Sequence, residues 1–339
     1  MKLQELLLVV VATVGCGHVE PADSCVPETD AELCAAVGKS CESQTGTDSC
    51  GEMRTVDCGT CADGEGCVVG VCKTPVCSTF NYTSEVNAGL SRSGLEDVVA
   101  AATPDGQVIV VAQAQSSCSA FHMILADETA PGSGTYAPQD VTTQLAGLGM
   151  FIGRESYAIT ADGLTLIGLS MDGKSWMTTT RSAIHQLDFA PASTNDFAAI
   201  NATNGGQFEA PVISADGLEF FYTITQADAT TNGIYSAVRV STALPFPAGT
   251  RLPAPVQDDQ YVASESADRL TLFLFKPFQS DVLTRSSTNG AWINPNAPAA
   301  PPAIAGWDHK VLADCMHLVG VDTTAGGCAN EDSYVFTRQ

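Results

Sequence analysis

A short motif returns along this chain at intervals of about 50 residues, and a repeat of that length restricts the fold to stacked units of one kind. Every copy has Asp at its third position, followed by a run of apolar residues, and three of the five copies have Gly after the Asp. The copies read "TPDGQVIVVAQ" from Thr103, "TADGLTLIGLS" from Thr160, "SADGLEFFYTI" from Ser214, "SADRLTLFLFK" from Ser266 and, more weakly, "LADCMHLVGVD" from Leu312. Propeller blades and solenoid units have repeats of this kind.

The residues around each motif indicate antiparallel strands on both sides of a turn. In the turn, Asp can accept a backbone N–H and Gly can take a positive φ without a Cβ clash. The run after the turn, such as 108–111 or 270–275, is apolar without alternation, which predicts a strand covered on both faces. Arg269 and Cys315 replace the Gly in two copies, so those two turns are expected to differ.

A third strand is expected in each repeat, and in four copies it ends in arginine. These residues are Arg181, Arg239, Arg285 and Arg338. An arginine in this place can hold a ligand. We expect instead that these arginines cap backbone carbonyls at the edges of the units, because a guanidinium is a rigid group with several N–H donors.

The pattern of Ser or Thr, any residue, Asp-Gly and an apolar strand resembles the WD40-like repeat of Tol-B-type propellers, over about residues 95–339. The resemblance implies an all-β fold, and the count of copies predicts five blades. The last copy ends before an outer strand, so we expect the segment 80–86 to close the ring as the fourth strand of that blade. An open or six-bladed arrangement is the alternative.

The N-terminus has the features of a targeting segment. The apolar run 6–14 is too short to span a bilayer and ends in "TVGCG", from Thr13 to Gly17. This sequence resembles the lipobox of bacterial lipoproteins, although Thr13 stands where that family usually has Leu. The resemblance implies a signal peptide over 1–15, a lipid on Cys16 and a periplasmic or surface-facing place in the outer membrane. The alternative is an ordinary secretory signal cut nearby.

Thirteen cysteines divide the rest of the chain. We predict a linker over 16–24, a disulfide-rich module over 25–77 and the propeller over 78–339. An exported module of this size needs covalent cross-links, because it cannot bury much apolar surface. Its connectivity stays open, and Cys58-Gly-Thr-Cys61 is read as two disulfide cysteines in preference to a zinc or redox pair. Outside this group we expect Cys315 to pair with Cys328, and Cys77 with Cys118.

The charge of the chain excludes several classes of partner. Lys and Arg total 15 against 38 Asp and Glu, a formal charge of −23. Nucleic acid and anionic membrane surfaces require basic groups, so neither is expected, and the membrane is approached only through the lipid. A soluble monomer that binds a protein or a carbohydrate is compatible with this charge.

Acidic residues stand near the start of the first strand of each repeat. In a propeller these strands line the central channel, so five carboxylates are expected around one mouth, where they can hold Ca²⁺ or accept hydrogen bonds from sugar hydroxyls. The candidates are Glu96 or Asp97, Glu155, Glu209, Asp258 or Asp259, and Asp308. Solvated loop acids are the simpler interpretation. No other cofactor is expected, since the sequence lacks P-loop, His-Glu-x-x-His and Gly-x-Ser-x-Gly motifs.

These features favour a surface-anchored, non-catalytic propeller that binds a protein or glycan. The alternative is a glycoside hydrolase with a carboxylate pair at the propeller axis, which requires a defined distance between two carboxyl groups. A purely structural envelope protein is a third possibility.

Overall fold

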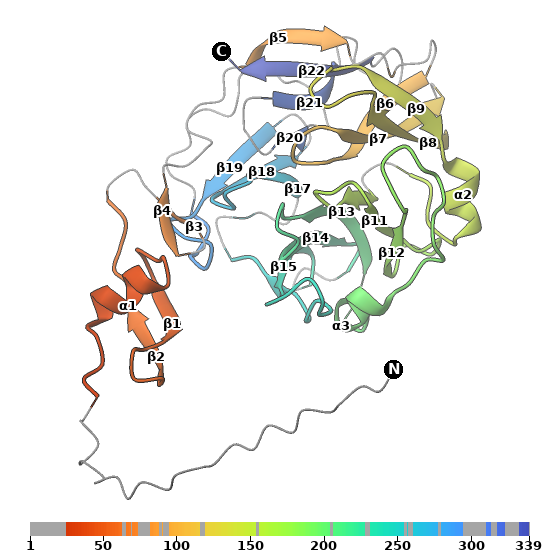
Figure 1. The fold of residues 1–339 in the computed structure, drawn as a ribbon. Helices are drawn as coiled ribbons and strands as arrows, with labels where there is room; N and C mark the ends of the chain where they lie inside the picture. Colours follow the sequence, from red (N-terminus) through yellow and green to blue (C-terminus); the bar gives the residue numbers. More distant parts are fainter. Residues whose placement is uncertain are drawn as a thin grey trace, which may run out of the picture. The chain divides into compact units, whose positions relative to one another are not determined.

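The computed structural model describes the chain in segments that fall into two compact units, 1–60 and 61–339 (Figure 1). Within the described part of the chain, no helix is long and apolar enough to cross a membrane. The described residues are 25–62, 66–68, 70–73, 82–87, 90, 95–115, 119–153, 156–203, 206–227, 231–253, 256, 260–276, 279–293, 310–312, 317–322 and 332–338. Cys16 and the pairs Cys315–Cys328 and Cys77–Cys118 lie outside these ranges, so they stay predictions.

The first unit contains helix α1 (Asp30–Ala36) and a hairpin of β1 (Ser43–Thr47) and β2 (Met53–Asp57). The helix begins where its sequence predicts, because Thr29 and Glu32 form a capping box that satisfies free N–H groups of the first turn. Leu33 is fully buried and packs with Val56 and Cys34 in a small core. A core of this size stabilises little on its own.

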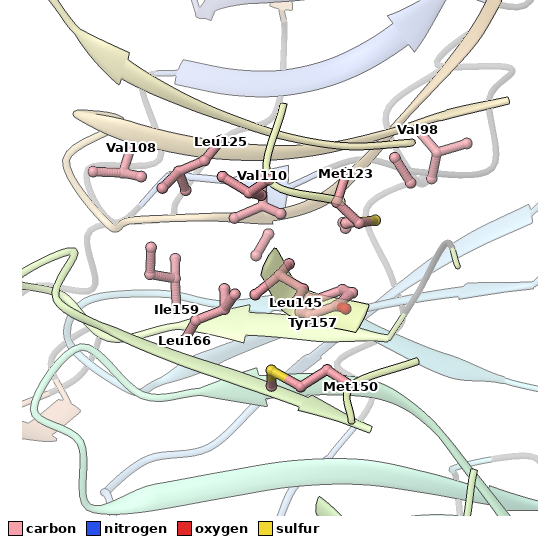
Figure 2. Packing of buried hydrophobic residues seen from close by; sticks show 14 residues of the cluster. Val98, Val108, Val110, Met123, Leu125, Leu145, Met150, Tyr157, Ile159 and Leu166 are labelled. Atoms are coloured by element: carbon pink, nitrogen blue, oxygen red, sulfur yellow. The ribbon is translucent and has the colours of Figure 1, made fainter. Parts of the chain in front are cut away.

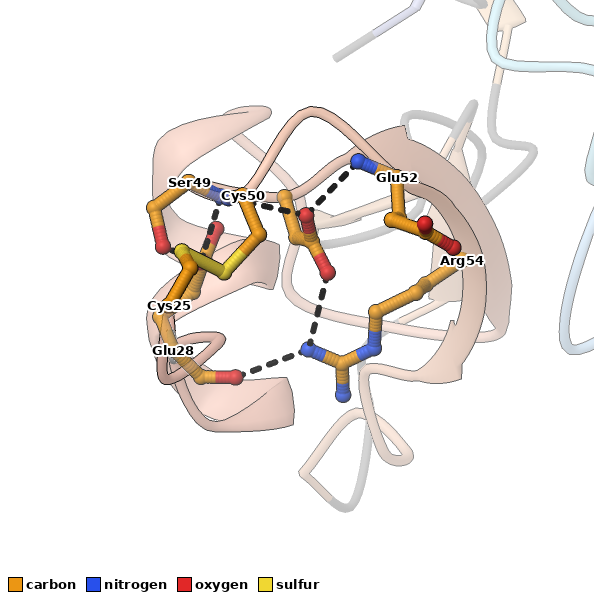
Figure 3. The surroundings of a disulfide bond; sticks show 7 residues. Cys25, Glu28, Ser49, Cys50, Glu52 and Arg54 are labelled. Atoms are coloured by element: carbon orange, nitrogen blue, oxygen red, sulfur yellow. Dashed lines mark hydrogen bonds and ion pairs between the residues drawn. A yellow bond between two sulfur atoms is a disulfide. The ribbon is translucent and has the colours of Figure 1, made fainter. Parts of the chain in front are cut away.

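Disulfides and polar contacts supplement that core. Cys25 pairs with Cys50 and Cys34 with Cys58, and Cys41 is also disulfide-bonded. Figure 3 shows the first of these bridges, beside which Glu28 accepts a hydrogen bond from the Ser49 backbone at 2.7 Å. The Arg54 guanidinium donates to the Glu28 carbonyl at 2.8 Å. The first unit is therefore held mainly by cross-links and charged contacts, as its cysteine content predicts.

A second hairpin, β3 (Gly66–Val68) and β4 (Val71–Lys73), belongs to the second unit. Cys61 and Cys72 are linked by a disulfide in this region. The Cys67 amide donates to the Ser286 carbonyl at 2.8 Å, and the Thr288 amide donates to the Cys67 carbonyl at 3.2 Å. The hairpin is therefore hydrogen-bonded to the loop that follows β19 (Gln279–Thr284) of the same unit. Cys58 and Cys61 are both disulfide-bonded to other cysteines, as expected.

In the described residues, the main body of the second unit forms five antiparallel sheets; strands follow chain order in the first four, and the fifth adds β5 after three strands in chain order (Figure 1). Short helices α2 (Thr142–Gly147), η1 (Asn195–Phe197) and α3 (Ala198–Asn201) lie in the connections. The first sheet contains β6 (Leu95–Ala102), β7 (Val108–Gln115), β8 (Ser119–Glu128) and β9 (Tyr136–Asp140), and the second contains β10 (Tyr157–Ile159), β11 (Thr165–Leu169) and β12 (Trp176–Thr180). The third contains β13 (Gln207–Ile213), β14 (Glu219–Thr225), β15 (Gly233–Val238) and β16 (Thr250–Arg251), and the fourth contains β17 (Tyr261–Glu265), β18 (Thr271–Lys276) and β19 (Gln279–Thr284). The fifth contains β20 (Lys310–Val311), β21 (His317–Asp322), β22 (Asp332–Arg338) and β5 (Tyr82–Asn87).

Strand β5 joins the fifth sheet from the opposite end of the unit's sequence. It pairs antiparallel with β22, with Val86 opposite Val335 and Ser84 opposite Thr337. This is the pairing expected for the segment 80–86, and Figure 1 shows the two strands side by side. The first strands also contact one another in turn, β6 with β10, β10 with β13, β13 with β17, β17 with β20, and β20 with β6.

The first four sheets pack face to face in succession, each sharing a buried cluster with the next. Figure 2 shows Val110 and Met123 of the first sheet facing Tyr157 and Leu166 of the second. On the other face of the first sheet, Ile109 belongs to a separate cluster. Covering both faces of β7 removes all of its central side chains from water, so the prediction drawn from its unbroken apolar run is confirmed.

The motif turns have one hydrogen-bond pattern. Thr103 donates its hydroxyl to Asp105 at 2.7 Å, the same Asp oxygen accepts the Gln107 amide at 3.0 Å, and Gly106 has φ +73°. The turns at Asp162, Asp216 and Asp268 repeat these bonds. Arg269 takes φ +60° where the other copies have Gly, so the expectation that its turn differs is wrong. Cys315 lies outside the described residues.

The recurring arginines cap these turns, as predicted. The Nε–H of Arg181 donates to the Gly163 carbonyl at 2.9 Å, that of Arg239 to the Gly217 carbonyl at 2.8 Å, and that of Arg285 to the Arg269 carbonyl at 2.6 Å. The side chain of Arg338 is outside the described set. Two of the arginines also reach an acid of the preceding sheet. These arginines therefore hold each turn in place and, in two cases, link neighbouring sheets.

Arg181 and Asp127 form the most completely buried of these links, with both terminal nitrogens 2.8 Å from carboxylate oxygens and both side chains 1% exposed. Asp127→Asn should lower the free energy of unfolding by about 3 kcal/mol, because it leaves a buried guanidinium without its counter-charge. Chemical denaturation followed by fluorescence measures this. Asp140→Asn is the control, since Asp140 pairs with His122 at the exposed surface and should cost less than about 1 kcal/mol. Equal losses would contradict the assigned role of the buried pair.

Candidate functional site

The predicted ring of acids is only partly within the described residues. Asp97 in β6 is fully buried and accepts a hydrogen bond from the Gln113 amide at 2.8 Å. Glu209 in β13 accepts from the Thr225 hydroxyl at 2.9 Å. Both therefore make contacts within their own sheets. Glu96 lies in β6 with its side chain undescribed, and the other candidates lie outside the described residues: Glu155, Asp258, Asp259 and Asp308.

The described acids do not form a cation site. Among the described residues, no three carboxylates bring oxygen atoms within 4.8 Å of one another. The predicted binding of Ca²⁺ by the strand-start acids stays a prediction.

The second unit contains a small central cavity of about 50 Å³. It is lined by the later parts of the first strands, including 100–104 of β6 and the following turn, Ala158 of β10 and Ala263 of β17. Three first strands shift register near this level, at 99–101, 209–212 and 262–264. Bulged, small residues leave little space here, and the cavity does not include the strand starts where the sequence placed its acids.

Glu265 is the acid that lines this cavity, and the sequence analysis missed it. It occupies the place held by Ile159 and Ile213 in other copies, and its side chain is 1% exposed. Its Oε1 accepts from Arg285 Nη2 at 3.1 Å, while Oε2 has no hydrogen-bond partner among the described residues. Burial, followed by the charge of Glu219, holds the pKa of Glu265 well above its usual range, which favours the neutral carboxyl.

Glu219 shares Arg285 with Glu265 but is ionised. Burial acts to raise the pKa of Glu219, yet the hydrogen bond and charge of Arg285, with a hydrogen bond from Arg269, hold it below its usual value. Arg285 Nη2 lies 2.8 Å and Arg269 Nη2 2.5 Å from Glu219 Oε2, and the Glu219 side chain is 2% exposed. These groups form a closed ion network between the third and fourth sheets, not an open catalytic pair.

A larger cavity of about 400 Å³ lies between the second and third sheets. We call it the inter-sheet cleft. Its walls are the two motif turns of those sheets, parts of β11 and β12, η1 and the loop after β15. Its lining includes the polar side chains of Asp162, Asp196, Asp216, Arg239 and Thr242 and the apolar side chains of Ile167, Phe197 and Phe246.

One residue of the repeat explains why this cleft is open. Between the third and fourth sheets, the Arg269 side chain reaches back to Asp216 at 3.0 Å and to Glu219 at 2.5 Å. The second and third sheets have Gly217 in place of Arg269 and Thr165 in place of Glu219. Both turns keep the same backbone, with φ +71° at Gly217 and +60° at Arg269. The cleft therefore occupies the space that an arginine fills one repeat later.

Arg239 forms one wall of the cleft. Its Nε–H and Nη1–H groups donate to the Gly217 and Leu244 carbonyls, and its guanidinium lies 4.2 Å from the centroid of the Phe246 ring. Its Nη2 makes no hydrogen bond to a described residue, whereas Arg181 and Arg285 direct theirs to an acid of the preceding sheet. Burial lowers the pKa of Arg239, against the charges of Asp196 and Asp216. The cleft thus presents a half-used guanidinium beside carboxylates.

Alignment of the repeat copies contains the signal for the ion network but not for the cleft. Glu265 and Arg269 differ from the residues at the same places in the other copies, and both belong to the fourth repeat. Glu219 belongs to the third repeat. A charged residue in an otherwise apolar place and a basic residue in a Gly place predict an ion pair between neighbouring units. The same comparison shows Gly at this place in three copies, Gly106, Gly163 and Gly217, so it does not distinguish the junction at Gly217 from the others.

No protein-family model and no curated protein sequence matches the chain. Among solved structures it is similar to TolB from Acinetobacter baumannii, with 14% identity over 88% of this chain and a TM-score of 0.40. The chain spans 60% of that TolB chain. It is also similar to a thermostable family-43 glycoside hydrolase, with 13% identity, 72% of this chain and 89% of that chain covered, and a TM-score of 0.45. The β-propeller domain of Cps50 (Swd1) from Myceliophteria thermophila is 9% identical over 72% of this chain and 84% of that chain, with a TM-score of 0.35.

The two glutamates of the ion network should give opposite pH dependences of stability. Because the folded-state pKa of Glu265 is raised, its contribution is present below the unfolded value of 4.5 and is lost as pH rises above it. Glu265→Gln should therefore gain stability relative to the natural protein as pH rises from about 4.5 to about 8, by up to about 1.4 kcal/mol per pH unit.

Glu219→Gln should show the reverse. The folded-state pKa of Glu219 is lowered, so its contribution is present above 4.5 and is lost as pH falls through the folded value. The measurement is the denaturation midpoint of both variants and of the natural protein from about pH 3 to about pH 8, because the effect of Glu219 lies below pH 4.5 and that of Glu265 above it. Parallel curves for the two variants would contradict the assignment of one neutral and one ionised carboxyl.

Proposed function

We propose that the protein is a surface-anchored, non-catalytic propeller of five blades that binds a protein or glycan partner. The contacts of the first strands in a cycle and the pairing of β5 with β22 support a closed ring, since closure leaves no edge of the fifth sheet for another chain to join. Five sheets then correspond to five blades, one for each copy of the motif.

The place of the protein follows from its N-terminus. The sequence "TVGCG" supports lipidation of Cys16, and the outer membrane then holds the protein through this lipid alone. The net charge of −23 keeps the folded units away from anionic lipid head groups and from one another, which supports a monomer.

The inter-sheet cleft is the observation that carries the binding function. Its volume of about 400 Å³ lies within the range of about 300–1,000 Å³ that is usual for ligand sites. It combines an apolar surface from Phe197 and Ile167 with the charged side chains of Arg239 and Asp196. The lining is about equally polar and apolar, which suits a ligand that has both polar groups and an apolar face.

The glycoside hydrolase alternative requires two accessible carboxyl groups beside a bound sugar. The two glutamates nearest the central cavity, Glu219 and Glu265, are both bonded to Arg285 and are 2% and 1% exposed, so this pair favours a structural role. Release of sugar by the natural protein would support the alternative and would overturn the non-catalytic proposal.

Gly217→Arg tests the cleft with a residue that this fold already accepts at the equivalent place in the next repeat. A Cβ at Gly217 meets Thr242 at 3.2 Å, and the arginine side chain would extend toward Asp162 as Arg269 does toward Asp216. We expect ligand binding by the soluble fragment from Cys25 onward to fall at least about tenfold, because the cleft would be filled.

Gly173→Arg is the matched control. Gly173 has φ +69° in the same kind of turn, at the other end of the second sheet, and a Cβ there meets nothing within 4 Å. Binding is measured on a glycan array and a displayed peptide library, with and without Ca²⁺. Loss of binding in both variants, or in neither, would remove the cleft from the proposal, and the absence of any ligand in both screens would overturn the binding function.

A further inference from the structure

The inter-sheet cleft offers hydrogen-bond donors and acceptors to the same ligand. The Nη2–H groups of Arg239 are donors without a partner among the described residues. The Asp196 carboxylate makes no hydrogen bond through its side chain to a described residue, and Asp162 uses only Oδ1 in its turn. The ligand must therefore both accept from a guanidinium and donate to a carboxylate.

The charges around the cleft restrict the ligand further. The charge of Asp216 is balanced by Arg269 at 3.0 Å. Asp162 and Asp196 then face a single cation, Arg239, so the cleft is slightly negative inside a protein with a net charge of −23. An anionic ligand is repelled by these acids, and an ammonium group, although attracted by them, offers no acceptor to the free N–H groups of Arg239. A neutral ligand meets neither penalty.

We propose that the inter-sheet cleft binds a neutral sugar, with adjacent hydroxyl groups held between Arg239 and the carboxylates of Asp196 and Asp162. A hydroxyl is the neutral group that donates and accepts at once, and a diol satisfies both sides of the cleft. The C–H face of a sugar ring suits the apolar wall of Ile167 and Phe197. This inference rests on the proposed binding function and adds the class of the ligand and the residues that select it.

A lysine-bearing protein and a divalent cation are the competing ligands. A lysine fits the two carboxylates but leaves the donors of Arg239 unused. A cation needs several oxygen ligands at short distance, and no three described carboxylates bring their oxygens within 4.8 Å of one another. The neutral sugar accounts for every free polar group named above, so it is favoured.

The test compares matched sugars on one array: neutral hexose oligosaccharides, their uronic acids and their N-unsubstituted amino sugars. The natural protein should bind the neutral set, with an affinity that changes less than about twofold from about 50 mM to about 500 mM NaCl, because screening acts on charged ligands. Asp196→Asn and Arg239→Met should each weaken binding of the retained sugar by about tenfold or more.

Arg239→Met removes the hydrogen bonds by which Arg239 holds its turn, so Asp196→Asn serves as a second variant. The Asp196 side chain makes no hydrogen bond to a described residue, so its replacement takes no such bond from the fold. Thermal midpoints identify any variant that is merely unfolded. Arg239→Lys should restore little affinity, because an ammonium lacks the fork of the guanidinium. Asp140→Asn, on the first sheet, is the control for loss of one surface charge and should leave binding unchanged.

The outcomes separate this inference from the proposed function. Preference for uronic acids or amino sugars, or a steep salt dependence, would overturn the neutral sugar and leave a binding protein. Capture of peptides alone, sensitive to Gly217→Arg, would do the same. Binding of neutral sugars that neither Asp196→Asn nor Gly217→Arg affects would overturn the cleft as the sugar site, while the function of binding glycans would stand.

Discussion

The second unit depends on one hydrogen-bonded turn, in which a single carboxylate oxygen accepts a Ser or Thr hydroxyl and the backbone N–H two residues later. The turn requires a left-handed residue directly after the Asp, which Gly adopts without cost and other residues adopt with strain. Arg269 is tolerated because its guanidinium forms ion pairs with Asp216 and Glu219 that offset this strain. An arginine at the end of the third strand fixes three of these turns to the rest of their sheets, and in the first sheet the Tyr136 hydroxyl donates to the Gly106 carbonyl instead.

The same turn fixes how neighbouring sheets meet, and the residue after the Asp sets the outcome. A Cβ at Gly163 would meet Val108 at 2.8 Å, so the first and second sheets are already close there. At Arg269 the long side chain fills the space between the third and fourth sheets. At Gly217 no side chain fills the space between the second and third sheets, and a cavity of about 400 Å³ remains there. One backbone therefore produces both packed and open junctions, and the choice lies in single side chains.

This division explains what the sequence could and could not predict. The motif turns, the covered strand 108–111, the capping arginines and the start of α1 depend on residues close together in the chain, so local patterns identify them. Glu265 and the cleft depend on contacts between residues about 50 apart in different sheets, which no local pattern contains. The sequence predicts a ring of acids from the starts of the first strands, whereas the later parts of these strands line the cavity.

The open cleft is not forced by the fold. Arg181 and Arg285 show that the arginine of the third strand can pair with an acid of the preceding sheet, and Arg269 shows that the position of Gly217 accepts an arginine. At the junction of the second and third sheets, an acid opposite Arg239 would give its guanidinium a partner, and an arginine at the position of Gly217 would pair with Asp162. Either change would also fill empty space, which stabilises a folded protein. A structural role thus accounts fully for Arg181 and Arg285 but leaves half of the Arg239 guanidinium unexplained. Departures of a chain from its own stabilising pattern are expected at functional sites, and this one supports the proposal that a ligand completes the interactions of Arg239.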